Sequence, residues 1–406
     1  MTAPPATPAH SSFTEALPGF DYRGFAAELD ALRAELERGA GPADVAHLGK
    51  LARWGRLATA LGYGTAWLAP NPVSAGLIAL GSTMRWTIVA HHTSHRGLDR
   101  IQGDHLTSRT FAKGWRRYPD WFDWIDPEAW DFEHNRLHHY HTGEVGDPDL
   151  PEEQLEWLRL ARVPSGLKVV ALFFLASTWK FVYYAPNTLA MLKEEQRRKG
   201  DRRPIDPGAR HTGVSLGHAW SPLHADGRAF WMRCILPFAL LRFVLIPALY
   251  LVIGTWGAFS VLLNSLLAEW ISNLHTFAVI VPNHAGDDVH RFDRASTDRA
   301  EFYVRQVLGS VNFSTGGETF AGDVNDVLHG FLNYQVEHHL WPDLSPLQYK
   351  RAAPRVKALC ARYGVPYLQE PLWKRVLQLV RTAMGSATMV RTRTLGRDER
   401  ARFSGA

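Results

Sequence analysis

Three short clusters of histidines are the residues of this chain best suited to chemistry. They read HHTSH (residues 91–95), HNRLHH (134–139) and QVEHH (335–339), in a chain that has 19 histidines. An isolated pair of histidines is usually a surface coincidence. Three clusters, each near a predicted membrane edge, predict a metal centre instead, because imidazole is a ligand for Zn, Cu, Fe and Ni.

The spacing within two of these clusters suits chelation. His91 and His95 are four residues apart, as are His134 and His138, and residues four apart share one face of an α-helix. The clusters also contain His92, His139, His338 and His339. Eight imidazoles exceed what one four- or six-coordinate ion needs, so two ions are the simplest account.

The chemistry of the other side chains bears on which metal is bound. Cys234 and Cys360 are the only cysteines, too few for an iron–sulfur cluster or a thiolate zinc site. A redox task then fits iron. An all-histidine shell leaves each ion positively charged, so nearby carboxylates should orient the ligands and offset the charge. The candidates, each of which could instead be an ordinary solvated charge, are Glu133, Asp147, Asp149 and Glu337.

Four apolar runs are the elements that would position these clusters. Residues 54–69 and 73–90 flank an Ala-Pro-Asn-Pro turn, and residues 234–253 and 257–281 flank a Gly-Thr-Trp-Gly turn. A helix needs about 20 apolar residues to cross the hydrocarbon core of a bilayer. We therefore predict four transmembrane helices in two hairpins.

A fifth apolar run, at residues 167–186, is not assigned as a transmembrane helix. If residues 134–139 and 335–339 share one site, an even number of crossings must separate them, so one run cannot span. The run at 167–186 is interrupted by lysines and precedes a strongly basic stretch, which belongs on the cytoplasmic side. We predict an interfacial helix there. The expected fold is all-α, with a helical cytoplasmic cap that holds the metals.

The ends of the chain are polar. Residues 1–53 should form a tail and an amphipathic helix at 25–39, and residues 371–406 a basic amphipathic helix and a tail. The net charge of +5 and the pI near 9.2 are compatible with nucleic acid or with an anionic membrane surface. The apolar runs favour the membrane, and we expect no nucleic-acid partner.

The three clusters resemble the histidine boxes of the membrane fatty acid desaturase superfamily. HHTSH fits its HxxxH first box and HNRLHH its HNxxHH second box, which Asp-Pro-Asp-Leu follows at 147–150. GFLNYQVEHHLWP (330–342) is similar to the third box in its QxxHH form, as in front-end and related acyl-lipid desaturases. The resemblance runs from about residue 54 to 370, which would make these residues the desaturase domain.

The resemblance also implies further site residues. The family has one more histidine ligand after its last span, and His284 occupies the matching place, with His275 as the second choice. Gln335 stands where other members have the first histidine of box three. His92 and His141 depart from the pattern, and we expect neither to be a ligand.

As an expectation from this resemblance, the chain uses two iron ions and O2 to insert a double bond into the acyl chain of a lipid or an acyl thioester, on the cytoplasmic face of a membrane. The first 53 residues hold no HPGG motif of a fused cytochrome b5 domain. Electrons would then come from a separate donor, a ferredoxin or a cytochrome b5 with its reductase.

Two alternatives remain open at this stage. A hydroxylase or ketolase of lipids, carotenoids or sterols would use the same histidine boxes. A non-catalytic membrane metal-binding protein or transporter would instead place histidines inside the spans. For an enzyme, an apolar substrate tunnel that enters from the cytoplasmic face is expected, and its candidate walls are Trp86, Trp115, Trp179, Trp270 and Phe277.

Overall fold

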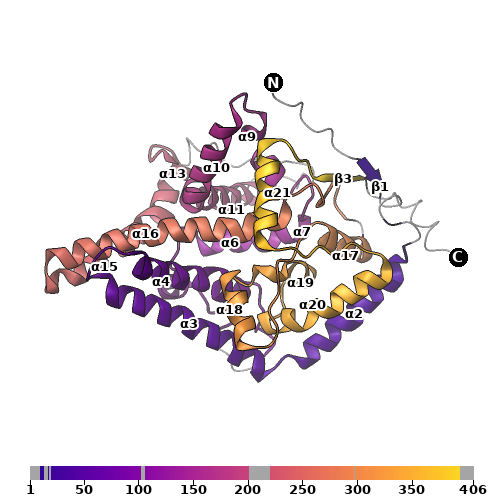
Figure 1. Ribbon diagram of the computed structural model, residues 1–406, viewed down its shortest axis with the longest axis horizontal. Helices are drawn as coiled ribbons and strands as arrows, with labels where there is room; N and C mark the ends of the chain where they lie inside the picture. The colour runs from indigo at the N-terminus through magenta and orange to yellow at the C-terminus, as the bar shows by residue number, and fades with distance from the viewer. Residues whose placement is uncertain are drawn as a thin grey trace.

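The computed structural model describes residues 10–12, 17, 20–101, 106–200, 220–296 and 298–393. The chain is mostly helical, which confirms the expected fold class in its main feature (Figure 1). The long helix α16 (Thr255–Ile280) and the short α15 (Ile246–Ala248) extend to the left in Figure 1, and helices α2 (Tyr22–Gly39) and α20 (Pro346–Tyr363) lie at the right. The expected tail at 1–9 and the last residues, 394–406, lie outside the described residues.

The first apolar pair forms two helices that pack along each other. They are α3 (Pro42–Ala66) and α4 (Pro72–Thr83), which continues as the π-helical η1 (Met84–Ala90) and α5 (His91–Ser94). Asn71 ends the turn between them, and its side chain accepts a hydrogen bond from Ser74 N at 2.8 Å. The helices approach closely, because a Cβ on Gly62 would lie 2.6 Å from Ile78 Cγ1.

The first arm of the second apolar pair changes helix type several times along its length, and we call it the bent arm. That arm runs through α13 (Ala225–Phe230), η6 (Trp231–Ile235), α14 (Leu236–Leu240), η7 (Leu241–Leu245), α15 (Ile246–Ala248) and η8 (Leu249–Ile253). Gly254, at φ 117°, turns the chain into α16 (Thr255–Ile280). α16 packs against α4, which joins the two pairs.

The buried charged residues of these helices contact protein partners. An unpaired charge in lipid would carry a large free-energy cost. The Arg242 guanidinium is buried, donates to Ser82 Oγ at 3.1 Å and lies 3.9 Å from the Glu269 carboxylate. Trp124 Nε1 donates to the same glutamate at 2.7 Å. Lys180 and Asp123 form a second buried ion pair.

Within the described part of the chain, three helical stretches are long and apolar enough to cross a membrane. They are Pro72–Ser94, Ser165–Gly200 and Ala225–Ile253. The first and third contain the predicted spans 73–90 and 234–253. The second contains the run at 167–186, and comprises α10 (Ser165–Trp179), the π-helical η5 (Lys180–Tyr184) and α11 (Ala185–Gly200).

The two remaining predicted spans, 54–69 and 257–281, lie mainly in α3 and α16. Both helices expose rows of large apolar side chains, as do α10 and the bent arm. The exposed residues include Leu57, Leu61, Val170, Phe174, Val244, Leu249, Val252, Trp256, Phe259 and Leu266. A surface this apolar fits contact with lipid better than contact with water.

The remaining described elements form a second, largely helical part of the molecule. Its main elements are α2 (Tyr22–Gly39), α17 (Arg299–Leu308), α18 (Phe320–Leu328), η10 (Leu332–Tyr334), α19 (Gln335–Leu340), α20 (Pro346–Tyr363) and α21 (Leu372–Met384). The shorter ones are η2 (Gly114–Arg116), η3 (Arg117–Trp121), α6 (Pro127–Phe132), η4 (Glu133–His138), α7 (His139–His141), α8 (Pro151–Gln154), α9 (Glu156–Leu160) and η9 (Val281–His284). α2 contains the amphipathic helix expected at 25–39; it buries Phe25, Leu29 and Leu32 and packs against α20.

A small parallel sheet departs from the purely helical expectation. Its strands are β1 (His10–Ser12), β3 (Val390–Arg393) and β2 (His290–Phe292), in the order β1-β3-β2. Strands of three or four residues are too short to show an alternating pattern, so no sequence pattern predicted them. The sheet includes residues 391–393, which were expected to belong to the C-terminal tail.

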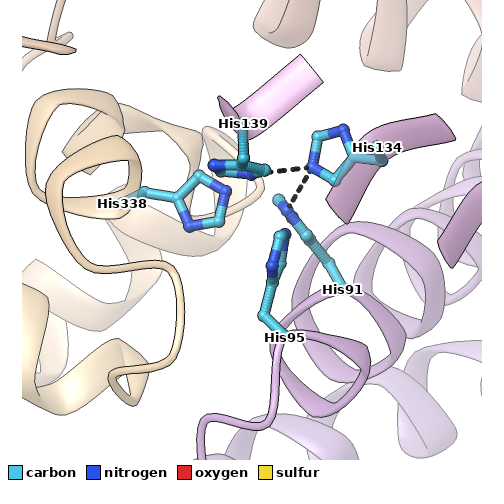
Figure 2. Close-up of side chains that lie close together, drawn as sticks. All are labelled: His91, His95, His134, His139 and His338. Atoms are coloured by element: carbon cyan, nitrogen blue, oxygen red, sulfur yellow. Dashed lines mark hydrogen bonds between the residues drawn. The ribbon is translucent and has the colours of Figure 1, made fainter. Parts of the chain in front are cut away.

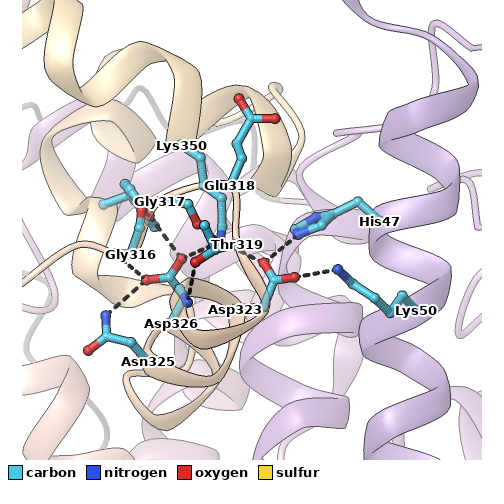
Figure 3. Close-up of polar contacts among 12 residues, drawn as sticks. His47, Lys50, Gly316, Gly317, Glu318, Thr319, Asp323, Asn325, Asp326 and Lys350 are labelled. Atoms are coloured by element: carbon cyan, nitrogen blue, oxygen red, sulfur yellow. Dashed lines mark hydrogen bonds and ion pairs between the residues drawn. The ribbon is translucent and has the colours of Figure 1, made fainter.

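A buried ionic network fixes the segment before the third histidine cluster (Figure 3). Lys350 of α20 lies 2.6 Å from Asp323 and 2.7 Å from Asp326, both on α18. Asp326 in turn accepts hydrogen bonds from Asn333 at 2.7 Å and Tyr334 at 2.9 Å. The chain is therefore held just before α19 begins.

Candidate metal centre

Five histidines from all three clusters form a first group. His91, His95, His134, His139 and His338 each offer a ring nitrogen, and these atoms all lie within 4.8 Å of one another. Figure 2 shows the rings projecting toward a common centre. His134 Nε2 lies 3.1 Å from His91 Nε2 and 3.3 Å from His139 Nε2.

Three more histidines form a second group beside the first. His138, His284 and His339 also bring ring nitrogens within 4.8 Å of one another. The Gln335 side-chain nitrogen lies between two of them, 3.0 Å from His284 Nε2 and 2.9 Å from His339 Nε2. The eight histidines expected to be ligands thus lie in two adjacent groups, with His284 rather than His275 completing the second.

The histidines of the second cluster divide between the two groups in a way that their spacing in the sequence did not predict. His134 and His138 were expected to chelate one centre from one α-helical face. Residues Glu133–His138 are instead π-helical, with i→i+5 rather than i→i+4 backbone hydrogen bonds, so the α-helical spacing rule does not apply there. His134 lies with His139 in the first group, and His138 lies in the second. His134 and His138 still meet Asp149 in a third set of close donor atoms.

The outer ring nitrogens are held by acceptors, which orients the rings. Nδ1 of His91 lies 3.2 Å from the Thr87 carbonyl oxygen, and Nδ1 of His284 lies 2.9 Å from that of Gly309. A carbonyl oxygen only accepts, so each Nδ1 donates and each Nε2 keeps its lone pair.

Side chains hold three further rings in the same way. His138 Nδ1 lies 2.8 Å from Asp147 Oδ1, His339 Nδ1 lies 3.0 Å from Thr142 Oγ1, and His338 Nδ1 lies 3.2 Å from the Tyr349 hydroxyl. Metal-binding histidines use their second nitrogen in this manner.

The electrostatics of the groups fits a bound cation. Burial, and then the neighbouring imidazoles, lowers the pKa of His134, His139, His338 and His339 well below the ordinary value. The rings are therefore neutral at physiological pH and present lone pairs. His95 Nε2 and His338 Nε2 are buried without a hydrogen-bond partner. Buried, unpaired lone pairs that converge are what a metal ion would satisfy.

The predicted carboxylates take different positions around the groups. Burial alone would raise the pKa of Asp147, but His138 and the backbone N–H groups of Gly143 and Asp149 outweigh it and hold that pKa below its usual range. Burial raises the pKa of Asp149 to about 6. Burial, and then the charge of Asp149, also raises the pKa of Glu133, which accepts a hydrogen bond from the Tyr184 hydroxyl at 3.1 Å.

Glu337 does not contact the histidine rings directly. Its carboxylate accepts hydrogen bonds of 2.8 Å from both Asn312 and Tyr367. Burial raises its pKa to about 7, although these two donors oppose the shift. Glu337 therefore anchors α19 rather than facing the cluster.

Three other histidines lie outside both groups. Nδ1 of His92 lies 2.7 Å from the Ile88 carbonyl oxygen, His141 pairs with Glu144 at 2.8 Å, and His275 lies 2.7 Å from the Leu328 carbonyl oxygen. Each ring is thus engaged with a protein acceptor.

An apolar cavity of about 630 Å³ reaches the histidines. His91 and His134 of the first group line it, as do His138, His284 and Gln335 of the second. Its volume is in the range of small-molecule sites.

Of the aromatic walls expected from the sequence, Trp86, Trp179 and Phe277 line this cavity. Trp115 and Trp270 do not, and both are exposed, so those two expectations were wrong.

The supporting residues Thr142, Gly309, Tyr349 and Tyr184 gave no sequence signal. Tyr349 is 11 residues beyond His338, and Gly309 is 25 residues beyond His284. Only the packing of separate helices brings such pairs together. Thr142, four residues after His138, could have been noticed by its helical spacing, because its hydroxyl also donates to the His138 carbonyl oxygen at 2.8 Å.

Comparison with known proteins agrees with this geometry. The chain is 26% identical over 364 residues to the NADPH-dependent stearoyl-CoA 9-desaturase of Mycobacterium tuberculosis, covering 86% of this chain and 75% of that protein. It is 34% identical over 95 residues to the fatty acid desaturase 2-like protein FADS2B of Mus musculus, which covers 23% of this chain and 18% of that protein. The family profile described as fatty acid desaturase matches residues 54–371. The chain therefore belongs to the fatty acid desaturase family and is an oxidoreductase.

Proposed function

We propose that this protein is an O2-dependent desaturase that introduces a double bond into the acyl chain of a lipid or an acyl thioester. The observation that carries the proposal is that one apolar cavity touches both histidine groups. A chain lying in that cavity would pass both. The stearoyl-CoA desaturase relative supports an acyl thioester as one carrier.

We further propose two iron ions as the cofactors. His91, His95, His134, His139 and His338 would hold one, and His138, His284 and His339 the other, with Gln335 beside it. When bound, the two ions would supply the redox chemistry by which O2, two electrons from the donor and two protons remove two hydrogens from a CH2–CH2 unit, giving an alkene and two waters. The electrons would come from a separate ferredoxin or cytochrome b5 type donor with its reductase.

The protein's own groups would position and shield this reaction. Asp147, Thr142 and Tyr349 hold the imidazoles by their outer nitrogens, so the rings do not turn when the substrate binds. Trp86, Trp179 and Phe277 would keep bulk water from the acyl chain. Burial raises the pKa of Glu133, whose carboxyl group accepts a hydrogen bond from the Tyr184 hydroxyl beside the cavity.

The proposed topology has four spans in two hairpins, with the site on the cytoplasmic face. Helices α10, the bent arm ending at η8, and α16 all lie between His139 and His284 in sequence. Since those two histidines share one site, an even number of crossings must separate them. The bent arm and α16 would form one hairpin, and α10 would lie in the interface. On this basis residues 54–370 form the catalytic unit, flanked by 1–53 and 371–406.

Mass spectrometry of cellular lipids after expression tests the function. A desaturase gives acyl chains that have lost two hydrogens, whereas a hydroxylase or ketolase with the same site gives chains that have gained oxygen. Metal analysis of the purified protein tests the cofactor. Two irons per chain support the proposal, whereas zinc with no lipid product would favour a non-catalytic metal-binding protein.

A further inference from the structure

The open side of the substrate cavity is apolar. Among the described residues that line it, only four are exposed, and all four are apolar: Trp157, Leu167, Val170 and Phe174. Every polar lining residue, the histidines included, is buried or half-buried. The cavity therefore meets the surface through the face of α9 and α10, and we call these four residues the mouth.

The surface around the mouth is apolar as well. Leu160 of α9 and Val163 in the following loop are exposed, and Phe173 of α10 is exposed on the side that meets Trp270 of α16. On the side of α10 and α16, the mouth therefore continues into the apolar face of the predicted membrane helices. Exposed Arg162 lies at its edge in sequence, and a tryptophan with a nearby cation is typical of the headgroup level of a membrane.

The frame of the mouth is fixed by hydrogen bonds. The buried Lys168 ammonium of α10 donates to the Arg159 carbonyl oxygen at 2.8 Å, which ties α10 to α9. The Arg159 guanidinium donates to the Ala387 carbonyl oxygen at 3.1 Å and also to that of Thr382 in α21. α9, α10 and α21 thus hold the opening in place.

We propose that the acyl substrate enters sideways from the bilayer, through this mouth, as a chain of a membrane-resident lipid. The inference rests on the proposed function and names the substrate class more narrowly. A chain that arrives from water would have to cross a hydrated, polar rim. Here the rim would lie in lipid, so an acyl tail would pass from one apolar environment to another without exposure to water.

A photoreactive phospholipid tests the route directly. The protein is placed in phosphatidylcholine vesicles in which one acyl chain carries a diazirine, irradiated and mapped by peptide mass spectrometry. Cross-links are expected on cavity residues Ala171 and Thr178. Val170→Trp should fill the mouth and reduce these cross-links at least tenfold. Val169→Trp is the matched control, because Val169 is the next residue, is 47% exposed against 62% for Val170, and does not line the cavity.

A second variant covers the case in which Val170→Trp fails to fold. Both native cysteines, Cys234 and Cys360, are buried, so a cysteine introduced by Val170→Cys can be modified selectively. An alkyl methanethiosulfonate should block cross-linking at Thr178, and reduction should restore it.

The outcomes separate this inference from the proposed function, since cross-linking needs no turnover. Blocked cross-links without any lipid product would support the side entrance and refute desaturation. Product formation that is unchanged in Val170→Trp would refute the side entrance and leave desaturation standing. A diazirine acyl-CoA added from water that labels the cavity equally in Val170→Trp and Val169→Trp would also overturn the inference.

Discussion

His138 Nδ1 lies 2.8 Å from Asp147 Oδ1, and this contact leaves Nε2 as the ring's free nitrogen toward His284 and His339. The backbone N–H groups of Gly143 and Asp149 donate to the same carboxylate at 2.8 and 2.9 Å. Asp147 is therefore fixed from two sides. A ligand that is held this firmly fixes the direction of its lone pair, which is why the contact bears on metal affinity.

Replacing Asp147 should weaken the second group more than the fold. In Asp147→Asn the amide still fills the space but loses the charge that supports the His138 ring. We expect iron affinity to fall by about 10–100-fold, with a parallel loss of desaturated product. Titration of the apo-protein with Fe(II) would measure it. Glu194→Gln, at an exposed surface carboxylate, is the control, and equal affinity in both variants would contradict the role of Asp147.

Single histidine replacements should separate the two groups. His339→Ala removes a ring from the second group and His95→Ala one from the first. We expect each variant to lose most of one iron and all product, because both ions are needed. Iron analysis with lipid profiling would measure this. His141→Ala and His275→Ala, which lie outside both groups, should keep iron and product. Full activity in His339→Ala would contradict the assignment.

The sequence predicted the histidines well but their grouping poorly. The motifs identified every ring that converges, because each ligand has to be a histidine whatever the local backbone. The pairing of His134 with His138 was predicted only in part: both meet Asp149, but His134 also belongs to the first group and His138 to the second, where the turn is π-helical rather than α-helical. Tyr349 and Gly309 could not be predicted, because their contacts depend on how distant helices pack. The sheet of β1, β2 and β3 was not predicted, because its strands are too short to show an alternating pattern.

The ionic network of Figure 3 predicts a pH-dependent stability. Burial opposes ionisation of Asp323, but hydrogen bonds from Lys350, Lys50 and His47 outweigh it and hold its pKa below the ordinary value. A depressed folded-state pKa contributes stability above the ordinary value of about 3.9 and loses it as pH falls below that value. The melting temperatures of wild type and Asp323→Asn should therefore differ at pH 6, and the difference should begin to narrow only as the pH falls below about 3.9. Glu318→Gln, at an exposed ion pair, should show a small and constant difference.

Replacing Lys350, the central cation of that network, should lower the free energy of unfolding more than replacing Asp323 alone. Lys350→Met would leave Asp323 and Asp326 buried with fewer partners, and breaking a buried pair costs about 3–5 kcal/mol. Because Asp326 also holds Tyr334, we expect the third histidine cluster to loosen, so iron content should fall together with the melting temperature. Arg351→Met, at the exposed pair with Glu318, is the control. An unchanged melting temperature in Lys350→Met would show that the network does not support the site.

Gln335 offers a final test of how the second group holds its ion. Its amide nitrogen lies about equally far from His284 Nε2 and His339 Nε2, at 3.0 and 2.9 Å, while Asn283 Nδ2 lies 3.2 Å from its oxygen. The side chain therefore stands where a further ligand could approach an ion bound by those two rings. Gln335→Ala should lower iron occupancy of the second group, whereas Gln335→His, which places an imidazole there, should retain it. Iron analysis beside the Asp147→Asn series would measure both. Loss of iron in Gln335→His but not in Gln335→Ala would show that the position only fills space.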